Sequence, residues 1–127
     1  MPYGSLLTDT VQSSTAGTPP QFNDGNGTQV GTLCRAWVNY KGTSTQSIRA
    51  SFNVSSVTYN STGNYLVNFT NAFVDANYCA AVNCDYDGTA FPINAKTFTT
   101  TNCLVQTVLP NLSAYSDHSI VNLAIFR

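Results

Sequence analysis

The fold is decided by one stretch of alternating side chains, Leu33-Cys34-Arg35-Ala36-Trp37-Val38-Asn39-Tyr40. In an extended chain, one face carries Cys34, Ala36, Val38 and Tyr40. The opposite face carries Leu33, Arg35, Trp37 and Asn39. Successive side chains of a β-strand point to opposite faces of the sheet. The alternation therefore predicts a strand of an antiparallel sheet with one apolar face.

The same period of two continues towards the C-terminus. Residues 47–54 predict a half-buried strand, with Ile48, Ala50, Phe52 and Val54 on the inner side. The turn Asn60-Ser61-Thr62-Gly63 between two alternating segments predicts a hairpin. Further strands are expected at residues 77–84, 96–101, 103–109 and 119–126, and a loop at 85–95. Seven or eight short strands predict an all-β fold, an antiparallel β-sandwich resembling a jelly roll, over residues 33–127.

Residues 1–32 have a different composition. They are rich in Ser, Thr, Gly and Pro and show no sustained periodicity. Pro19-Pro20 favours an extended backbone, and Asp24-Gly25-Asn26-Gly27 is typical of a turn. This segment cannot bury enough apolar area by itself to offset the entropy of ordering. We therefore expect an extended arm or stem.

The last segment predicts self-association. Ile120-Val121-Asn122-Leu123-Ala124-Ile125-Phe126 is apolar on both faces, so it should be covered on both sides. Trp37 also falls on the face opposite Ala36 and Val38. A homo-oligomer is expected, and its subunit interface is predicted to contain Trp37, Arg35, Val121, Leu123 and Ile125.

The composition excludes several classes of partner. Only 9% of the residues are charged, the net charge is -1, and the chain has no glutamate. Such a surface has no electrostatic footprint for nucleic acid or anionic lipid. No stretch approaches the roughly 18 apolar residues that span a bilayer, and no signal peptide is expected at the start. The composition suits neutral ligands, such as glycans, or tight protein assembly.

The cysteines do not predict a metal site or a cofactor. Cys34, Cys79, Cys84 and Cys103 form no Cys-x-x-Cys pair, and the single His118 is not at ligand spacing. Small buried hydrophobic residues are the favoured interpretation. A disulfide that involves Cys79 or Cys84 remains an alternative, and metal binding is a weaker one.

No catalytic site is predicted. Ser116-Asp117-His118-Ser119 places three triad residue types side by side in sequence, whereas a triad is assembled in space, so a polar turn is the better interpretation. An acid pair for glycan cleavage could be drawn from Asp75, Asp85, Asp87 and Asp117, but this alternative is not favoured. Asp85-Tyr86-Asp87-Gly88 lacks the later ligands of a calcium loop.

A binding surface is the remaining candidate, because loops on a rigid sandwich often carry recognition. Aromatic rings stack on sugar rings, and Asp and Asn fix hydroxyl groups by hydrogen bonds. The predicted 85–95 loop offers both kinds of side chain, and Tyr115 in the 110–118 loop is a second candidate. The predicted ligand-binding residues are Asp85, Tyr86, Asp87, Phe91, Asn94 and Tyr115.

Several sequence blocks carry a family resemblance: residues 35–43, residues 48–57, and residues 62–73 with 75–78. The chain resembles the C-terminal domain of bacteriophage tail-fibre proteins. The resemblance implies a β-rich, usually trimeric domain of the virion, which assembles in the host cytoplasm, contacts other virion proteins and binds a host-surface glycan or outer-membrane protein. A structural virion protein, such as a capsid decoration or a tail knob, is the alternative, and a glycan-degrading enzyme is less favoured.

Overall fold

The computed structural model describes residues 4, 7–16, 18–43, 45–86, 89–90, 93–111 and 113–127. The chain divides into two units, Met1–Leu33 and Cys34–Arg127. In the first unit, β1 (Phe22–Asn23) and β2 (Gln29–Gly31) pair antiparallel. The carboxylate of Asp24 closes the turn between them by accepting hydrogen bonds from the backbone N–H groups of Asn26 and Thr28, each at 2.9 Å.

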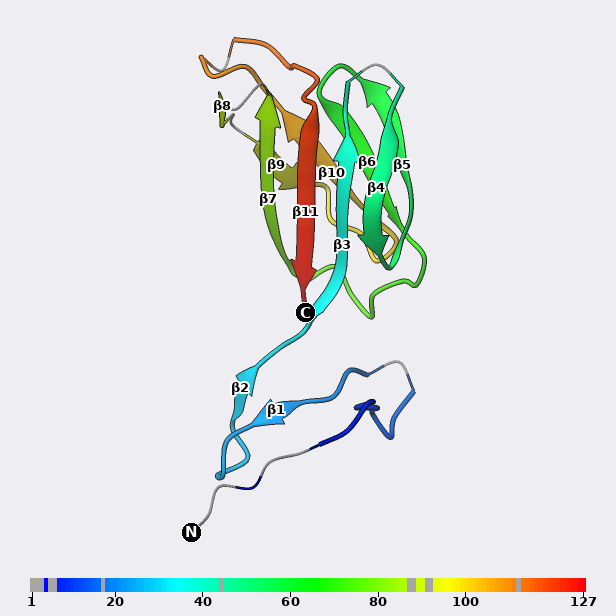
Figure 1. The fold of residues 1–127 in the computed structure, drawn as a ribbon, viewed down its shortest axis with the longest axis vertical. Helices are drawn as coiled ribbons and strands as arrows, with labels where there is room; N and C mark the ends of the chain where they lie inside the picture. The colour runs from blue at the N-terminus through cyan, green and yellow to red at the C-terminus, as the bar shows by residue number, and fades with distance from the viewer. Residues whose placement is uncertain are drawn as a thin grey trace. The chain divides into compact units, whose positions relative to one another are not determined.

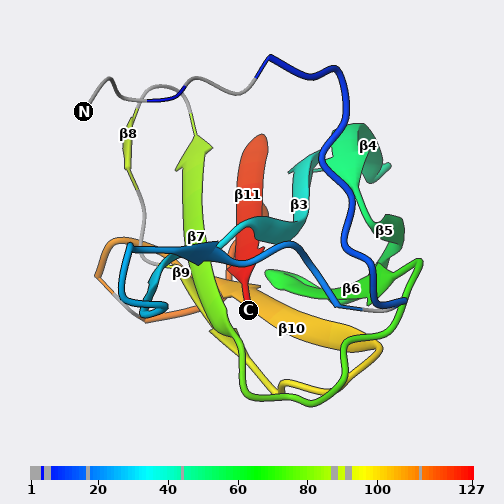
Figure 2. The ribbon, with the colours of Figure 1, turned by 90° about the horizontal axis from the view of Figure 1, so that it is seen from below.

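The second unit is an antiparallel β-sandwich, as predicted (Figure 1). A five-stranded sheet has the order β4-β3-β11-β7-β8, and a four-stranded sheet has the order β5-β6-β10-β9. Figure 2 shows the two layers end on. The strands are β3 (Cys34–Lys41), β4 (Ser47–Phe52), β5 (Val54–Ser61), β6 (Asn64–Phe69), β7 (Cys79–Tyr86), β8 (Thr89–Ala90), β9 (Ile93–Lys96), β10 (Asn102–Thr107) and β11 (Ile120–Phe126).

The core lies between the two sheets and follows the predicted alternation. Ala36, Val38 and Tyr40 of β3 are buried, and the residues between them are not. Tyr40 packs edge-on against Tyr65 of the facing sheet, with ring centroids 5.3 Å apart. The opposite end of the core is filled by a cluster of aromatic rings contributed by Phe69, Phe73, Tyr78 and Phe98.

The predicted hairpin at Gly63 is confirmed. β5 and β6 pair antiparallel around a turn of two residues, Thr62 and Gly63. Gly63 has a φ of 63°, which is the left-handed region that a residue with a Cβ rarely adopts. The backbone N–H of Gly63 donates to the Asp117 carboxylate at 2.7 Å, so this turn is tied to the segment that precedes β11.

The predicted strand over residues 47–54 is wrong in two respects. Asn53 has a φ of 54° and interrupts the strand, so that β4 ends in one sheet and β5 begins in the other. Its side chain holds this crossing by donating to the Arg35 carbonyl and accepting from the Asn71 N–H. β4 is also an edge strand whose six side chains are all exposed, so Ile48, Ala50 and Phe52 do not form an inner face.

The predicted loop at residues 85–95 is mostly strand. β7 continues to Tyr86, and β8 and β9 follow within the expected loop. The predicted strand at residues 96–101 is therefore wrong: β9 ends at Lys96, and Thr97 has a φ of 52°. In the register with β10, Lys96 pairs with Leu104 and Ile93 with Thr107, so the strand begins three residues earlier than predicted.

The structure describes all four cysteines, and none of them forms a disulfide. Cys84 and Cys103 are buried core residues, as predicted, whereas Cys34 is half-buried and Cys79 is exposed. Burial raises the pKa of the Cys103 thiol to about 12. No helix among the described residues has the length and apolar character to cross a membrane.

Candidate functional site

The outer face of the five-stranded sheet exposes an apolar row that crosses four strands. The pairings Trp37↔Phe52, Ala124↔Trp37 and Ala124↔Ala81 place these four residues side by side. Side chains of directly paired residues lie on the same face of a sheet. Trp37 is 38% exposed and Phe52 is 54% exposed. Two large aromatic side chains therefore border a strip of two alanines.

An asparagine ladder runs beside this row. Asn122 of β11 lies between Asn39 of β3 and Asn83 of β7 in the sheet register. Asn39 Nδ2 donates to Asn122 Oδ1 at 2.5 Å, and Asn122 Nδ2 donates to Asn83 Oδ1 at 2.6 Å. Each amide carries two N–H groups and two acceptor positions, and the ladder uses only part of them. The ladder therefore presents oriented donors and acceptors to the outside.

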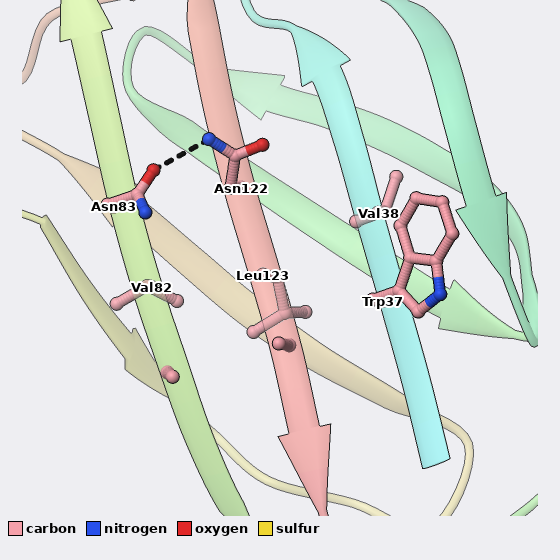
Figure 3. A pocket seen from close by; sticks show the side chains of 8 residues that line it. Trp37, Val38, Val82, Asn83, Asn122 and Leu123 are labelled. Carbon is pink, nitrogen blue, oxygen red and sulfur yellow. Dashed lines mark hydrogen bonds between the residues drawn. The ribbon is translucent and has the colours of Figure 1, made fainter. Parts of the chain in front are cut away.

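A hollow of about 290 Å³ lies where the two rows meet (Figure 3). Trp37, Ala81, Ala124, Asn83 and Asn122 line it, together with parts of Val38, Val82 and Leu123. The small alanine side chains leave this space beside the large indole ring. Figure 3 shows the hydrogen-bonded Asn122–Asn83 pair on β11 and β7, and it shows the Trp37 ring beside β3, on the side towards β4. The volume is close to the lower end of the range of small-molecule sites, about 300–1,000 Å³.

The two rows that border the hollow carry no charge. The apolar row consists of Phe52, Trp37, Ala124 and Ala81, and the second row continues the asparagine ladder to Ala50, which pairs with Asn39. On β3, the charged residues of this face are Arg35 and Lys41, near the two ends of the strand. The guanidinium carbon of Arg35 lies 6.0 Å from the centre of the Phe73 ring. The hollow is therefore suited to an uncharged ligand.

The structure describes only part of the predicted ligand-binding set. Asp87 and Phe91 lie outside the described residues, as does the side chain of Tyr86. Asp85 is half-buried in β7 of the five-stranded sheet, where its carbonyl accepts a hydrogen bond from the Ser119 hydroxyl at 3.1 Å. Asn94 belongs to β9 of the other sheet. These residues thus do not share one loop.

Two of the predicted residues, Asn94 and Tyr115, adjoin the same side chain, Gln106 of the four-stranded sheet. Asn94 pairs with Gln106 in the register, and Gln106 Nε2 donates to the Tyr115 hydroxyl at 3.1 Å. Gln106 also donates to the Asn64 side chain. Tyr115 is 49% exposed. This cluster is a second polar surface of the domain.

Three of the predicted interface residues are core residues. Val121, Leu123 and Ile125 lie on the inner side of β11 and are 0%, 2% and 0% exposed. β11 lies in the middle of the sheet, between β3 and β7, so its inner side is covered by the facing sheet of the same chain. The prediction that these three side chains contact another subunit is therefore wrong. Trp37 and Arg35 lie on the outer face, where a contact with another subunit stays a prediction.

The polar residues before β11 act within the structure. Asp117 Oδ1 accepts hydrogen bonds from the Tyr65 hydroxyl and the Gly63 N–H, each at 2.7 Å. The carbonyl of His118 accepts a hydrogen bond from the Gly42 N–H at 2.9 Å. Among the other aspartates considered for an acid pair, Asp75 forms an ion pair with Arg127. Asp117 and His118 therefore tie the segment before β11 to the turns beside it.

The stability of the domain is expected to fall as the pH drops below about 6.5, the ordinary pKa of histidine. His118, the only histidine, is 1% exposed, and burial lowers its pKa. The unfolded chain then takes up a proton at a higher pH than the folded chain, so protonation favours unfolding. Urea denaturation at pH 7.5, 6.5 and 5.5 measures this loss. The His118→Gln variant should lack this decrease. A wild-type free energy of unfolding that rises from pH 7.5 to pH 5.5 would contradict the prediction.

The described residues contain no group of three or more His, Cys, Asp or Glu side chains that could hold a metal ion. The aromatic and amide groups of the outer face are suited to hydrogen bonding and ring stacking. Sequence reasoning missed Asn83, Asn122, Ala81 and Ala124, because only the pairing of β7, β11 and β3 brings them together.

Comparisons with protein-family models, with curated proteins and with solved structures find no match to this chain.

Proposed function

We propose that the chain is a non-catalytic recognition module at the tip of a virion fibre. In this proposal it assembles as a homotrimer with other virion proteins, after synthesis in the host cytoplasm, and it binds a receptor on the host cell surface. The observation that carries the proposal is the outer face of the five-stranded sheet, where exposed Trp37 and Phe52 lie beside an asparagine ladder.

The outer face of the five-stranded sheet has the properties of a contact surface. Large exposed aromatic side chains in a contiguous row leave apolar area in water, and such patches mark interaction sites. The rows lie on β3, β11, β7 and β4 of one sheet, and three of these strands contribute buried side chains to the core. A surface built on strands loses little conformational entropy on binding, which favours affinity.

A second candidate function rests on β4. This strand lies at the edge of the five-stranded sheet, and its six side chains are all exposed. Edge strands offer backbone N–H and C=O groups to another strand. A structural virion protein that docks on a neighbour through β4 would also use such an edge. It would join the particle without contributing to host attachment.

We expect the labelled chain of residues 1–127 to bind saturably to cells of the host bacterium and to compete with the virion for adsorption. Trp37→Ala should weaken this binding roughly tenfold or more, because central aromatic residues dominate most contact surfaces. Native mass spectrometry of the same preparation should give three times the 13.6 kDa of the chain.

Val74→Ala is the matched control, since it removes an apolar side chain that is 76% exposed on a loop outside the face. It should bind as the wild type does. Incorporation into particles without binding to cells would instead favour the structural function.

A further inference from the structure

We propose that the hollow beside Trp37 binds one ring of an uncharged glycan. This inference rests on the proposed function and specifies the chemical class of the receptor. It also moves the predicted ligand site from the segment around residues 85–94 to the outer face of β3, β11 and β7, and it assigns Trp37 to that site in place of the predicted subunit interface. The hollow, the indole ring and the asparagine ladder are the three features that carry it.

The apolar side of the hollow matches the C–H face of a sugar ring. Trp37 borders the space, and Ala81 and Ala124 line it with methyl groups. Aromatic rings bury a large area against such a face, and the small alanines leave the room that a ring needs. A flat protein surface pressed on the same place would leave the hollow unfilled and would lose those packing contacts.

The polar side of the hollow matches hydroxyl groups. Asn83 Oδ1 is the last acceptor of the ladder, which leaves the Asn83 amide nitrogen to donate to a ligand. Asn122 lies next to it across neighbouring strands, whose spacing is about 4.8 Å. A hydroxyl both donates and accepts, so one sugar can satisfy the remaining amide donors and acceptors. Apolar coverage of the same amides would leave them unsatisfied, at a cost in free energy.

The charge distribution selects an uncharged sugar. The side chains that line the hollow and carry this inference are all neutral: Trp37, Ala81, Ala124, Asn83 and Asn122. An acidic glycan would enter without a counter-charge inside the hollow. Neutral polysaccharides are therefore the expected class, and polyanionic ones are expected to bind more weakly.

The test follows the fluorescence of Trp37, the only tryptophan of the chain. The chain of residues 1–127 is titrated with oligosaccharides of dextran, mannan and galactan, with alginate oligosaccharides as the charged comparison. Calorimetry provides a second readout. We expect saturable binding of at least one neutral series with a change in Trp37 emission. Asn83→Ala should weaken it roughly tenfold, the effect of losing one well-formed hydrogen bond.

Tyr115→Ala is the matched control, because it removes an exposed ring from the cluster on the other sheet. It should leave sugar binding unchanged. The inference is overturned if no neutral series binds, if Tyr115→Ala abolishes binding while Asn83→Ala does not, or if Trp37 emission changes on dilution alone. The last result would mean that a second copy of the chain covers the hollow.

Cell binding separates failure of this inference from failure of the proposed function. Saturable attachment to host cells that is lost after protease treatment of the cells, without any binding of the neutral oligosaccharides, would indicate a protein receptor. The recognition function would then stand and the glycan inference would fail. Absence of attachment to host cells would count against the recognition function itself.

Discussion

Replacing Gly63 with alanine is expected to lower the free energy of unfolding of the domain by about 4 kcal/mol. A Cβ at this position would lie 2.3 Å from the Thr107 carbonyl oxygen and 2.8 Å from the Ser116 nitrogen, both of which are backbone atoms. The φ of 63° adds about 1–2 kcal/mol for a residue with a Cβ. Neither backbone atom can move without disturbing the hydrogen bonds that tie Thr107 to Gly63 and Ser116.

The measurement is urea denaturation of Gly63→Ala beside the wild type. A loss of this size is a large fraction of the roughly 5–15 kcal/mol that stabilises a typical domain. Gly27→Ala is the control: Gly27 also has a positive φ, 83°, but no atom lies within 4 Å of the position of its Cβ. It should leave the main unfolding transition unchanged. Equal midpoints for Gly63→Ala and the wild type would show that the hairpin is not closed as described.

Replacing Leu123 with alanine is expected to cost about 3 kcal/mol, whatever the protein concentration. Leu123 is 2% exposed and packs in the core between the two sheets. The substitution removes buried carbon atoms and leaves a cavity that the surrounding strands fill only in part. Since the side chain lies within one chain, its loss should not depend on association between chains.

Ala124→Ser provides the comparison for Leu123→Ala, because Ala124 is the next residue of β11 and faces the opposite way. Its effect on the free energy of unfolding should stay within about 0.5 kcal/mol. The two variants should also have the same native mass as the wild type. If Leu123→Ala instead dissociated an oligomer and left the folded chain equally stable, the assignment of β11 to the core would be wrong.

Alternation within one strand could be predicted from the sequence, and the breaks between strands could not. Residues 33–40 indicated the buried face of β3 correctly, because a strand with one covered side imposes a period of two. Asn53 fits the same period in sequence, yet its left-handed φ ends β4 there. Asn is one of the few residues with a side chain that adopts this conformation, so it was the one local signal for the break.

The register between paired strands decides which residues become neighbours on the outer face, and a single sequence does not determine that register. Three different strands contribute Asn39, Asn83 and Asn122. The hydrogen bond between Asn39 and Asn122 spans 83 positions of the sequence, and the one between Asn122 and Asn83 spans 39 positions. The apolar character of both faces of residues 120–126 indicated a covered strand. This apolar character did not indicate whether the covering sheet belongs to the same chain or to another one. That missing information explains why Val121, Leu123 and Ile125 were assigned to an interface.

NMR of the side-chain amides tests the recognition face most directly. In a ¹H–¹⁵N spectrum of the chain, addition of the best-bound neutral oligosaccharide should shift the signals of the Trp37 indole N–H and of the Asn83 and Asn122 side-chain amides. The signals of Asn94 and Gln106, on the other sheet, should stay in place. Shifts at Asn94 and Gln106 with an unchanged Trp37 signal would contradict the account, because the receptor would then occupy the opposite face of the sandwich.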